Sequence, residues 1–249
     1  MKKHQTVLTS GLTSGQMKEL ICAVSEGVPT DLSAAAAQHW IGHKKDLSRE
    51  LRKILFGPVA AIADKAASPI IAEWQSFYAS IGYPCGDLSG VRIPENPNDA
   101  NRAIIMAQGI TPQSAYDLCD KNFKCWKLTS ESLDNIVISE RTAQNGPYAI
   151  RVRDRVEADE ELKGLSYNQL KAQNFIGITL EERLIYELKY FKETNKHLDI
   201  HNWTRCDGSL YRDGFVPSVH WSSYDGEMLV YRHRSDFADG DLRSRAAVI

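Results

Sequence analysis

The stretch TLEERLIYELKYFKETN, residues 179–195, carries the clearest structural signal in this chain. Thr179 followed three residues later by Glu182 forms a capping box. In that motif the threonine hydroxyl accepts the Glu182 backbone N–H, and the glutamate reaches back to the N–H of Thr179. One apolar stripe follows at helical spacing, made of Leu180, Leu184, Leu188 and Phe191 with Ile185 beside it. The stretch therefore predicts a helix that packs one face on a core and ends at Thr194-Asn195.

Residues 203–249, downstream of this helix, have the pattern of short strands in polar loops. Strands are predicted at residues 216–221, 228–232 and 242–248. Three Asp-Gly pairs, which favour tight reversals, separate them: Asp213-Gly214, Asp225-Gly226 and Asp239-Gly240. The segment is therefore predicted to form several tight hairpin-like turns between short antiparallel strands.

Upstream, residues 148–156 alternate apolar and polar side chains, as a strand with one buried face does. A short helix is predicted at residues 166–173. Earlier still, the pattern predicts a strand at 103–107, a helix that starts at Thr111-Pro112, and a strand at 136–138. Residues 84–99, rich in Pro, Gly and Asn, favour a loop or a boundary.

The N-terminal third is helical in pattern. Helices are predicted at residues 16–24, at 32–41 with Asp31 as cap, from Asp46 or Ser48 to Leu55, and at 59–78 with a kink at Pro69. The whole chain is therefore predicted as an α+β protein with three parts: a helical domain at 1–85, a small α/β linking segment at 86–146, and a ligand-binding domain at 147–249.

Composition excludes several classes of protein. The chain has 249 residues and a net charge of −2, so it lacks the strong basic field of a dedicated nucleic-acid binder. A nucleic-acid partner is therefore not expected. No run of 18 apolar residues and no apolar segment of a signal peptide occur. A membrane partner is therefore not expected either, and a cytoplasmic location is predicted. Five widely spaced cysteines without a CxxC pair indicate free thiols.

Catalytic signatures are absent from the sequence. It contains no GxGxxG, GxxxxGK[ST], GxSxG or HExxH pattern. His197 and His201, pooled with His220 and His233, make a conceivable set of metal ligands, but such imidazoles are more often part of an ordinary strand or loop surface. We therefore predict no cofactor, no metal site and no catalytic residue.

The segment 203–240 is dense in side chains that make good contacts. Rigid aromatic rings supply area at low entropic cost, and short polar groups supply adaptable hydrogen bonds. The predicted ligand-binding residues are Tyr211, Arg212, Asp213, His220, Trp221, Ser223, Tyr224, Asp225, Tyr231, Arg232, His233, Arg234, Asp236 and Phe237. Trp221 is open to two interpretations, as a contact or as a core residue, and an ordinary exposed sheet has a similar composition.

Lysine usage favours a contact surface over an ordinary exposed sheet in this segment. The chain has fifteen lysines, and none follows Lys196, although six arginines do. A segment without Lys or Gln is what results when the adenines of AAC or AAT codons are randomised, because codons that end in a pyrimidine encode neither residue.

The spacing of apolar and basic positions in this region resembles a known arrangement. Its framework consists of Val216-Pro217, Val219, Trp221, Val230, Leu242-Arg243-Ser244-Arg245 and Val248, preceded by the capped helix from Thr179. It resembles an uncharacterised bacterial family whose copies keep such a framework and differ between its points. It also resembles the variable proteins of diversity-generating retroelements, which display a diversified surface on a C-type-lectin fold.

This resemblance implies a C-type-lectin-like domain at about 147–249, in which the strand at 242–248 pairs back with the strand at 148–156. It implies binding without catalysis, with an unknown protein as ligand and a variable surface between residues 209 and 240. The usual Gly-Phe-Arg near the C-terminus and the Trp-Asn-Asp and Glu-Pro-Asn calcium motifs of sugar-binding lectins are absent. Calcium-dependent sugar binding is therefore not implied.

Two alternatives come from other functional classes. Asp154, Glu157, Asp159 or Glu161 could hold a divalent metal beside arginines that match phosphate, as in a metal-dependent nuclease or a phosphate-ligand enzyme. The same acidic run also suits the positive end of a helix. The other alternative is a structural interaction protein with one fixed partner and no variable surface.

Overall fold

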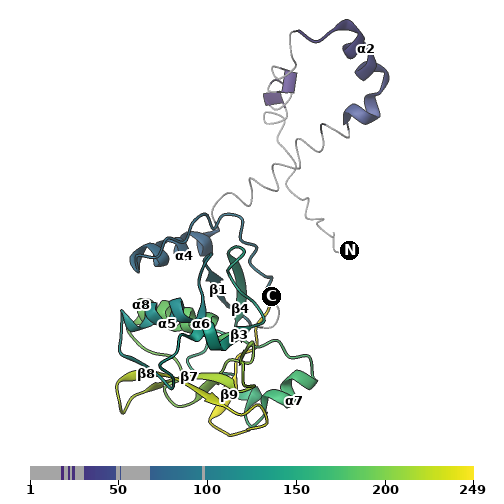
Figure 1. Cartoon of the computed structure of the whole chain (residues 1–249). Coiled ribbons are helices and arrows are strands. Elements are labelled where there is room, and N and C mark those ends of the chain that lie inside the picture. Colours follow the sequence, from purple (N-terminus) through teal and green to yellow (C-terminus); the bar gives the residue numbers. More distant parts are fainter. Residues whose placement is uncertain are drawn as a thin grey trace, which may run out of the picture. The chain divides into compact units, whose positions relative to one another are not determined.

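The computed structural model of the chain (Figure 1) describes residues 18, 19, 22, 24, 25, 31–48, 51, 68–96 and 99–249. The chain divides into two compact units, Met1–Ala63 and Asp64–Ile249. In the first unit, helix α2 (Ala34–Gly42) is capped by Ser33, whose Oγ accepts the Ala36 N–H at 3.2 Å. The predicted cap at Asp31 is wrong, because Ser33 is the residue that directly precedes the first helical turn. The helices predicted at 16–24, from Asp46 or Ser48 to Leu55, and at 59–78 lie partly outside the described residues.

The second unit mixes helices with short strands, which confirms the α+β class. Its first half contains α4 (Pro69–Ser80), β1 (Arg102–Met106), α5 (Pro112–Asp120), β2 (Cys125–Lys127), α6 (Leu133–Ile136), β3 (Val137–Ser139) and β4 (Tyr148–Val152). Its second half contains the 3₁₀ turn η1 (Glu160–Leu162), α7 (Tyr167–Ala172), α8 (Leu180–Thr194), β5 (Trp203–Arg205), β6 (Ser209–Tyr211), β7 (Val216–Ser222), β8 (Glu227–His233) and β9 (Leu242–Ser244).

A five-stranded sheet has the order β2-β8-β7-β5-β9. Its inner pairs β8-β7 and β7-β5 are antiparallel, and its two edge pairs β2-β8 and β5-β9 are parallel. The Asp-Gly turns predicted at 213–214 and 225–226 precede β7 and β8, where Gly214 and Gly226 have the positive φ values, 85° and 64°, that such turns need. Two further antiparallel pairs, β1-β4 and β3-β6, complete the set of strands in the described residues.

The C-terminal segment returns to β4, as the sequence predicts, but only at one residue pair. Arg151 and Val248 exchange both backbone hydrogen bonds at 2.9 Å. The strand β9 itself ends at Ser244 and pairs with β5 instead. Along its whole length β4 pairs with β1, which sequence patterning did not identify as its partner.

Helix α8 has the predicted capping box. Thr179 Oγ1 accepts the Glu182 N–H at 3.3 Å, and Glu182 Oε2 accepts the Thr179 N–H at 2.7 Å. The buried Glu182 carboxylate also accepts Arg141 Nε at 2.8 Å. The helix ends at Asn195, whose φ of 54° is the left-handed conformation that stops a helix.

The capping box yields a first prediction. Thr179→Ala removes the acceptor for the Glu182 N–H, so the free energy of unfolding should fall by about 1 kcal/mol. Urea denaturation of the parent and variant chains measures this. Thr179→Ser keeps the hydroxyl oxygen and should stay close to the parent, so equal stabilities of the Ala and Ser variants would contradict the role of the cap.

One hydrophobic core extends across the predicted internal boundaries. Ile71, Trp74 and Phe77 of α4 belong to the same cluster as Ile104 of β1 and Leu184 of α8. The compact unit therefore begins before the boundary predicted between residues 85 and 86. The segment 86–146, predicted to link two domains, supplies a strand to each of the three sheets.

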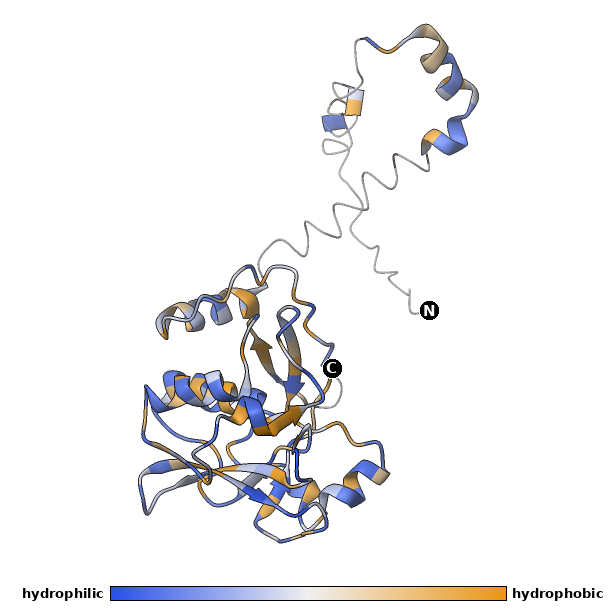
Figure 2. Cartoon of the chain, in the orientation of Figure 1, coloured by the Kyte–Doolittle hydropathy of each residue, from blue (hydrophilic) through white to orange (hydrophobic). Residues whose placement is uncertain are grey.

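Figure 2 shows β1 as hydrophobic almost throughout, and its residues Ala103–Met106 are all buried. Within the described part of the chain, no helix combines the length and the apolar character that crossing a bilayer requires.

Candidate functional site

The two faces of the five-stranded sheet differ in what they carry. Residues paired directly across β7 and β8 share a face, so His220 lies with Leu229, and Val219 lies with Val230. Val219 and Val230 are fully buried on the side where α8 contacts β7. The opposite side, on which His220 and Tyr231 lie, is partly exposed. This outer side holds the candidate site.

A continuous set of rings covers the outer side of the sheet. It is called the aromatic face below and consists of Trp126, Trp203, His220, Tyr231, His233 and Phe237. Trp203 occupies its centre: its ring centroid lies 4.6 Å from that of His220, 6.2 Å from Tyr231 and 6.0 Å from His233. Trp126 stacks on Tyr231 at 6.4 Å, and Phe237 stacks on His233 at 5.5 Å.

Three rings of the aromatic face are well exposed, namely Trp126 at 42%, Tyr231 at 38% and Phe237 at 44%. The two imidazoles are held by hydrogen bonds. His220 Nδ1 donates to the Asn202 carbonyl at 3.0 Å, and His233 Nδ1 lies 3.0 Å from Ser218 Oγ. Burial, with help from the nearby Arg205 guanidinium, lowers the pKa of His233, so this imidazole is neutral at pH 7.

The predicted ligand-binding residues divide into groups that the structure keeps apart. His220, Tyr231, His233 and Phe237 belong to the aromatic face. Ser223, Tyr224 and Asp225 form the tip of the β7-β8 hairpin, where Tyr224 is 98% exposed. Arg234 and Asp236 pair with each other at 2.7 Å in the loop after β8.

A fourth group lies away from the aromatic face, around a cavity of about 290 Å³. Tyr211, Arg212, Asp213 and Arg232 line it. The Arg232 guanidinium pairs with Asp213 and lies 4.6 Å from the centre of the Phe215 ring. Tyr211 is only 5% exposed, so as a contact residue it is limited to the wall of this cavity.

Trp221 lies on the inner side of the sheet, which decides between its two interpretations. Its ring stacks on His197 with parallel planes and a centroid distance of 3.3 Å, and it meets Phe123 edge-on. His197 Nδ1 in turn lies 2.9 Å from Glu187 Oε1. Trp221 therefore packs against the core instead of facing solvent as a contact.

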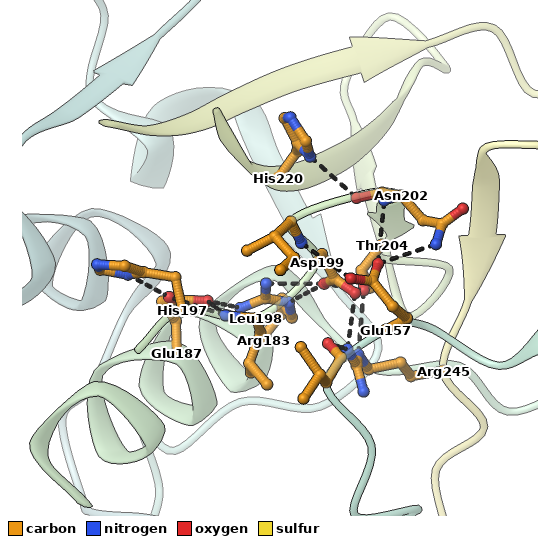
Figure 3. A network of polar contacts seen from close by, with 12 residues as sticks. Glu157, Arg183, Glu187, His197, Leu198, Asp199, Asn202, Thr204, His220 and Arg245 are labelled. Carbon is orange, nitrogen blue, oxygen red and sulfur yellow. Dashed lines mark hydrogen bonds and ion pairs between the residues drawn. The ribbon is translucent and has the colours of Figure 1, made fainter. Parts of the chain in front are cut away.

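A buried polar network supports the sheet from behind (Figure 3). The Asp199 carboxylate, fully buried, accepts Arg183 Nε at 2.9 Å and Arg245 Nη2 at 2.7 Å, and it also binds the Thr204 hydroxyl. Arg183 Nη1 donates to Glu187 at 2.8 Å. Burial alone raises the pKa of Asp199, but the Arg245 and Arg183 guanidiniums outweigh burial and hold the pKa below its ordinary value.

This network reaches the aromatic face through two connections. Glu157 accepts the Asn202 backbone N–H at 3.0 Å and its side-chain amide at 2.9 Å, and the Asn202 carbonyl accepts His220 (Figure 3). The Asp199 carbonyl accepts the Trp221 N–H in β7 at 3.1 Å. The backbone at Asp199 and Asn202 therefore connects the buried polar side chains to His220 and to β7.

The carboxylates considered for a metal do not converge. Asp154 accepts Tyr186 Oη at 3.3 Å, Asp159 pairs with Arg153 at 3.1 Å, and Glu161 pairs with Arg155 at 2.8 Å. Glu157 binds the turn at Ile200–Asn202 as described. In the part of the chain that the structure describes, no group of three or more His, Cys, Asp or Glu side chains is arranged to hold a metal ion.

Sequence reasoning did not include Trp126 and Trp203 among the predicted contacts. Trp203 stands in the dense segment 203–240, and its aromatic character was a usable signal. Trp126 lies in the three-residue strand β2, which joins the sheet only by parallel pairing with β8, where Trp126 is opposite Leu229. No local pattern marks such a pairing between residues about a hundred positions apart.

In comparisons with known proteins, no family model, no curated protein and no solved structure matches this chain.

Proposed function

We propose that this chain is a non-catalytic ligand-binding protein, and that its aromatic face contacts a protein partner. The observation that carries the proposal is the continuity of six rings from β2, β5, β7, β8 and the loop after β8, with three of the rings well exposed. Protein interfaces are enriched in Trp and Tyr, which dominate their binding energy when they are desolvated at the centre.

The rigid support of the face favours binding as well. His220 is hydrogen-bonded to the Asn202 carbonyl and β7 to the Asp199 carbonyl, so these parts of the face lose little conformational freedom when a partner binds. Binding surfaces that are ordered in advance avoid part of the entropic cost of association.

We further propose that the surface between residues 209 and 240 is variable, on a C-type-lectin-like arrangement. The framework positions Val216, Val219, Val230 and Leu242 are at most 2% exposed, whereas Tyr224 and the Arg234–Asp236 pair lie at the surface. Changes at such exposed positions leave the core intact. The antiparallel bridge between Arg151 and Val248, with α7 and α8 between the two segments, supports the lectin-like arrangement.

Affinity capture from lysate of the source cells tests the binding proposal. We expect a protein retained by the parent chain to be lost when Trp126, Tyr231 and Phe237 are replaced together by alanine, because truncation of central aromatic residues typically costs more than about 1 kcal/mol each. The control is Ile138→Ala, an exposed apolar position on β3 outside the face. Unchanged retention with the triple variant would overturn the proposal.

Variability has its own test in the coding DNA of residues 203–240. We expect a near-identical repeat elsewhere in the genome that differs only at adenines and lies near a reverse transcriptase. Absence of such a repeat would remove the variable surface but leave an ordinary binding domain in place.

A further inference from the structure

The loop that follows β8 brings carboxylates to the rim of the aromatic face. Phe237 of this loop stacks on His233, and the Asp241 carbonyl accepts the Trp203 N–H at 2.7 Å. Asp239 acts electrostatically on His233. Asp239 and Asp241 are both exposed, and they follow Phe237 in the loop whose backbone binds Trp203.

These two carboxylates have no cationic partner among the described residues. Asp239 Oδ1 accepts only the Asp241 backbone N–H, at 2.9 Å. The third carboxylate of the loop, Asp236, is already paired with Arg234. The rim therefore carries two negative charges that internal ion pairs leave unmatched.

The cations near the aromatic face are paired elsewhere. Arg205 is buried and forms two hydrogen bonds with Asp207, and Lys124, near Trp126, pairs with Glu227 at 2.9 Å. Lys163 and Arg243 both reach Gly240, between the two aspartates, where Arg243 Nε donates to the Gly240 carbonyl at 3.4 Å, but the ion pairs of both cations are with Glu160. His233 is neutral at pH 7 because its pKa is lowered by burial. Among the described residues, no lysine or arginine forms an ion pair with either carboxylate.

Aromatic ring faces are themselves negative, because the π-system carries a quadrupole. Exposed rings beside unmatched carboxylates therefore complement a positive charge on an alkyl stem better than a neutral or acidic group. A lysine or arginine side chain fits this description, since its methylene groups can lie on the rings while its charged end meets the rim.

We infer that the partner of the aromatic face is a protein segment that places a lysine or arginine on the rings beside Asp239 and Asp241. This inference rests on the proposed function, because it names the chemistry of the partner for that same surface. Acidic and purely apolar segments are the competing occupants that the experiment separates.

The probes are three capped peptides in which glycine alternates with lysine, with the neutral isostere norleucine, or with glutamate. Binding to the full chain is followed by titration calorimetry. We expect the lysine peptide to bind about tenfold more tightly than the norleucine peptide, and the glutamate peptide not to bind. The double variant D239N/D241N should weaken lysine-peptide binding about fivefold.

A matched double variant controls for net charge. E95Q/D117N removes two exposed carboxylates from other regions, the 86–96 segment and helix α5, and should bind the lysine peptide like the parent. Equal loss in both double variants, or no binding of the lysine peptide, would overturn the inference. If the norleucine peptide binds as well as the lysine peptide and the W126A/Y231A/F237A variant loses both, the inference fails while the binding face stands.

Discussion

Replacement of Asp199 by asparagine is expected to lower the free energy of unfolding by about 3–5 kcal/mol, because it removes the carboxylate that two buried guanidiniums share. Arg245 Nη2 and Arg183 Nε both donate to Asp199, and all three side chains are shielded from solvent. The other hydrogen-bond acceptors of Arg245 are the Thr204 hydroxyl and the carbonyls of Arg155 and Val156, none of which carries a charge. Urea denaturation monitored by tryptophan fluorescence measures the change.

Asparagine is the informative substitution at this position. Asp199 has a φ of 51°, and asparagine adopts this left-handed conformation readily, so the variant tests the charge and not the backbone. The control is Asp236→Asn, which breaks the exposed pair with Arg234 and should leave stability unchanged. If the two variants lost equal stability, Asp199 would not be the centre of the network.

Replacement of Glu181 by glutamine should stabilise the chain at alkaline pH and change little in acid. Burial raises the pKa of Glu181 to about 7, although Ser139 Oγ donates to its carboxylate at 2.7 Å. Above its folded pKa the parent must keep a charge in the core, and glutamine removes that cost. The raised pKa corresponds to about 3 kcal/mol.

The sign follows from proton binding. In the folded chain Glu181 holds its proton up to a higher pH than in the unfolded chain, whose reference pKa is 4.5. Its contribution to stability is therefore present below the unfolded value and is lost as the pH rises toward 7. Denaturation curves of parent and variant at about pH 5 and about pH 8.5 measure the difference.

An exposed glutamate provides the comparison. Glu95→Gln removes the same charge from the surface, so the free energy of unfolding of this variant should stay close to that of the parent as the pH rises. A Glu181→Gln variant that is less stable than the parent at alkaline pH would show that Glu181 is stabilised as a carboxylate inside the fold. The same result would contradict the prediction that protonated Glu181 contributes to the free energy of unfolding at low pH.

Local chemistry explains which elements could be predicted from the sequence. The capping boxes at Thr179 and Thr111 locate the starts of α8 and α5. The side chains that bind the free backbone N–H groups of the first turn are only three residues apart in the chain. Asp213-Gly214 and Asp225-Gly226 likewise mark turns, since glycine takes positive φ without steric cost.

The candidate site could be predicted only in part. The segment 203–240 was identified by its composition, and four of its predicted residues belong to the aromatic face. Composition does not say which side of a strand a residue occupies, and a shift of one residue reverses the side. For that reason composition alone does not place Trp221, and it does not separate Tyr211 and Arg232 from the residues of the aromatic face.

The sequence by itself therefore determined the starts of α5 and α8, the turns at Asp213-Gly214 and Asp225-Gly226, and the segment that is rich in contact-making side chains, since each depends on residues close together in the chain. The tertiary structure alone decided that β2 pairs with β8, that β1 pairs with β4, and that Asp199 binds Arg183 and Arg245. These contacts join segments far apart in the chain, and they form only because the shared core brings those segments together. The aromatic face exists by the same cause, since Trp126 and Trp203 reach Tyr231 only through the order of strands in the sheet.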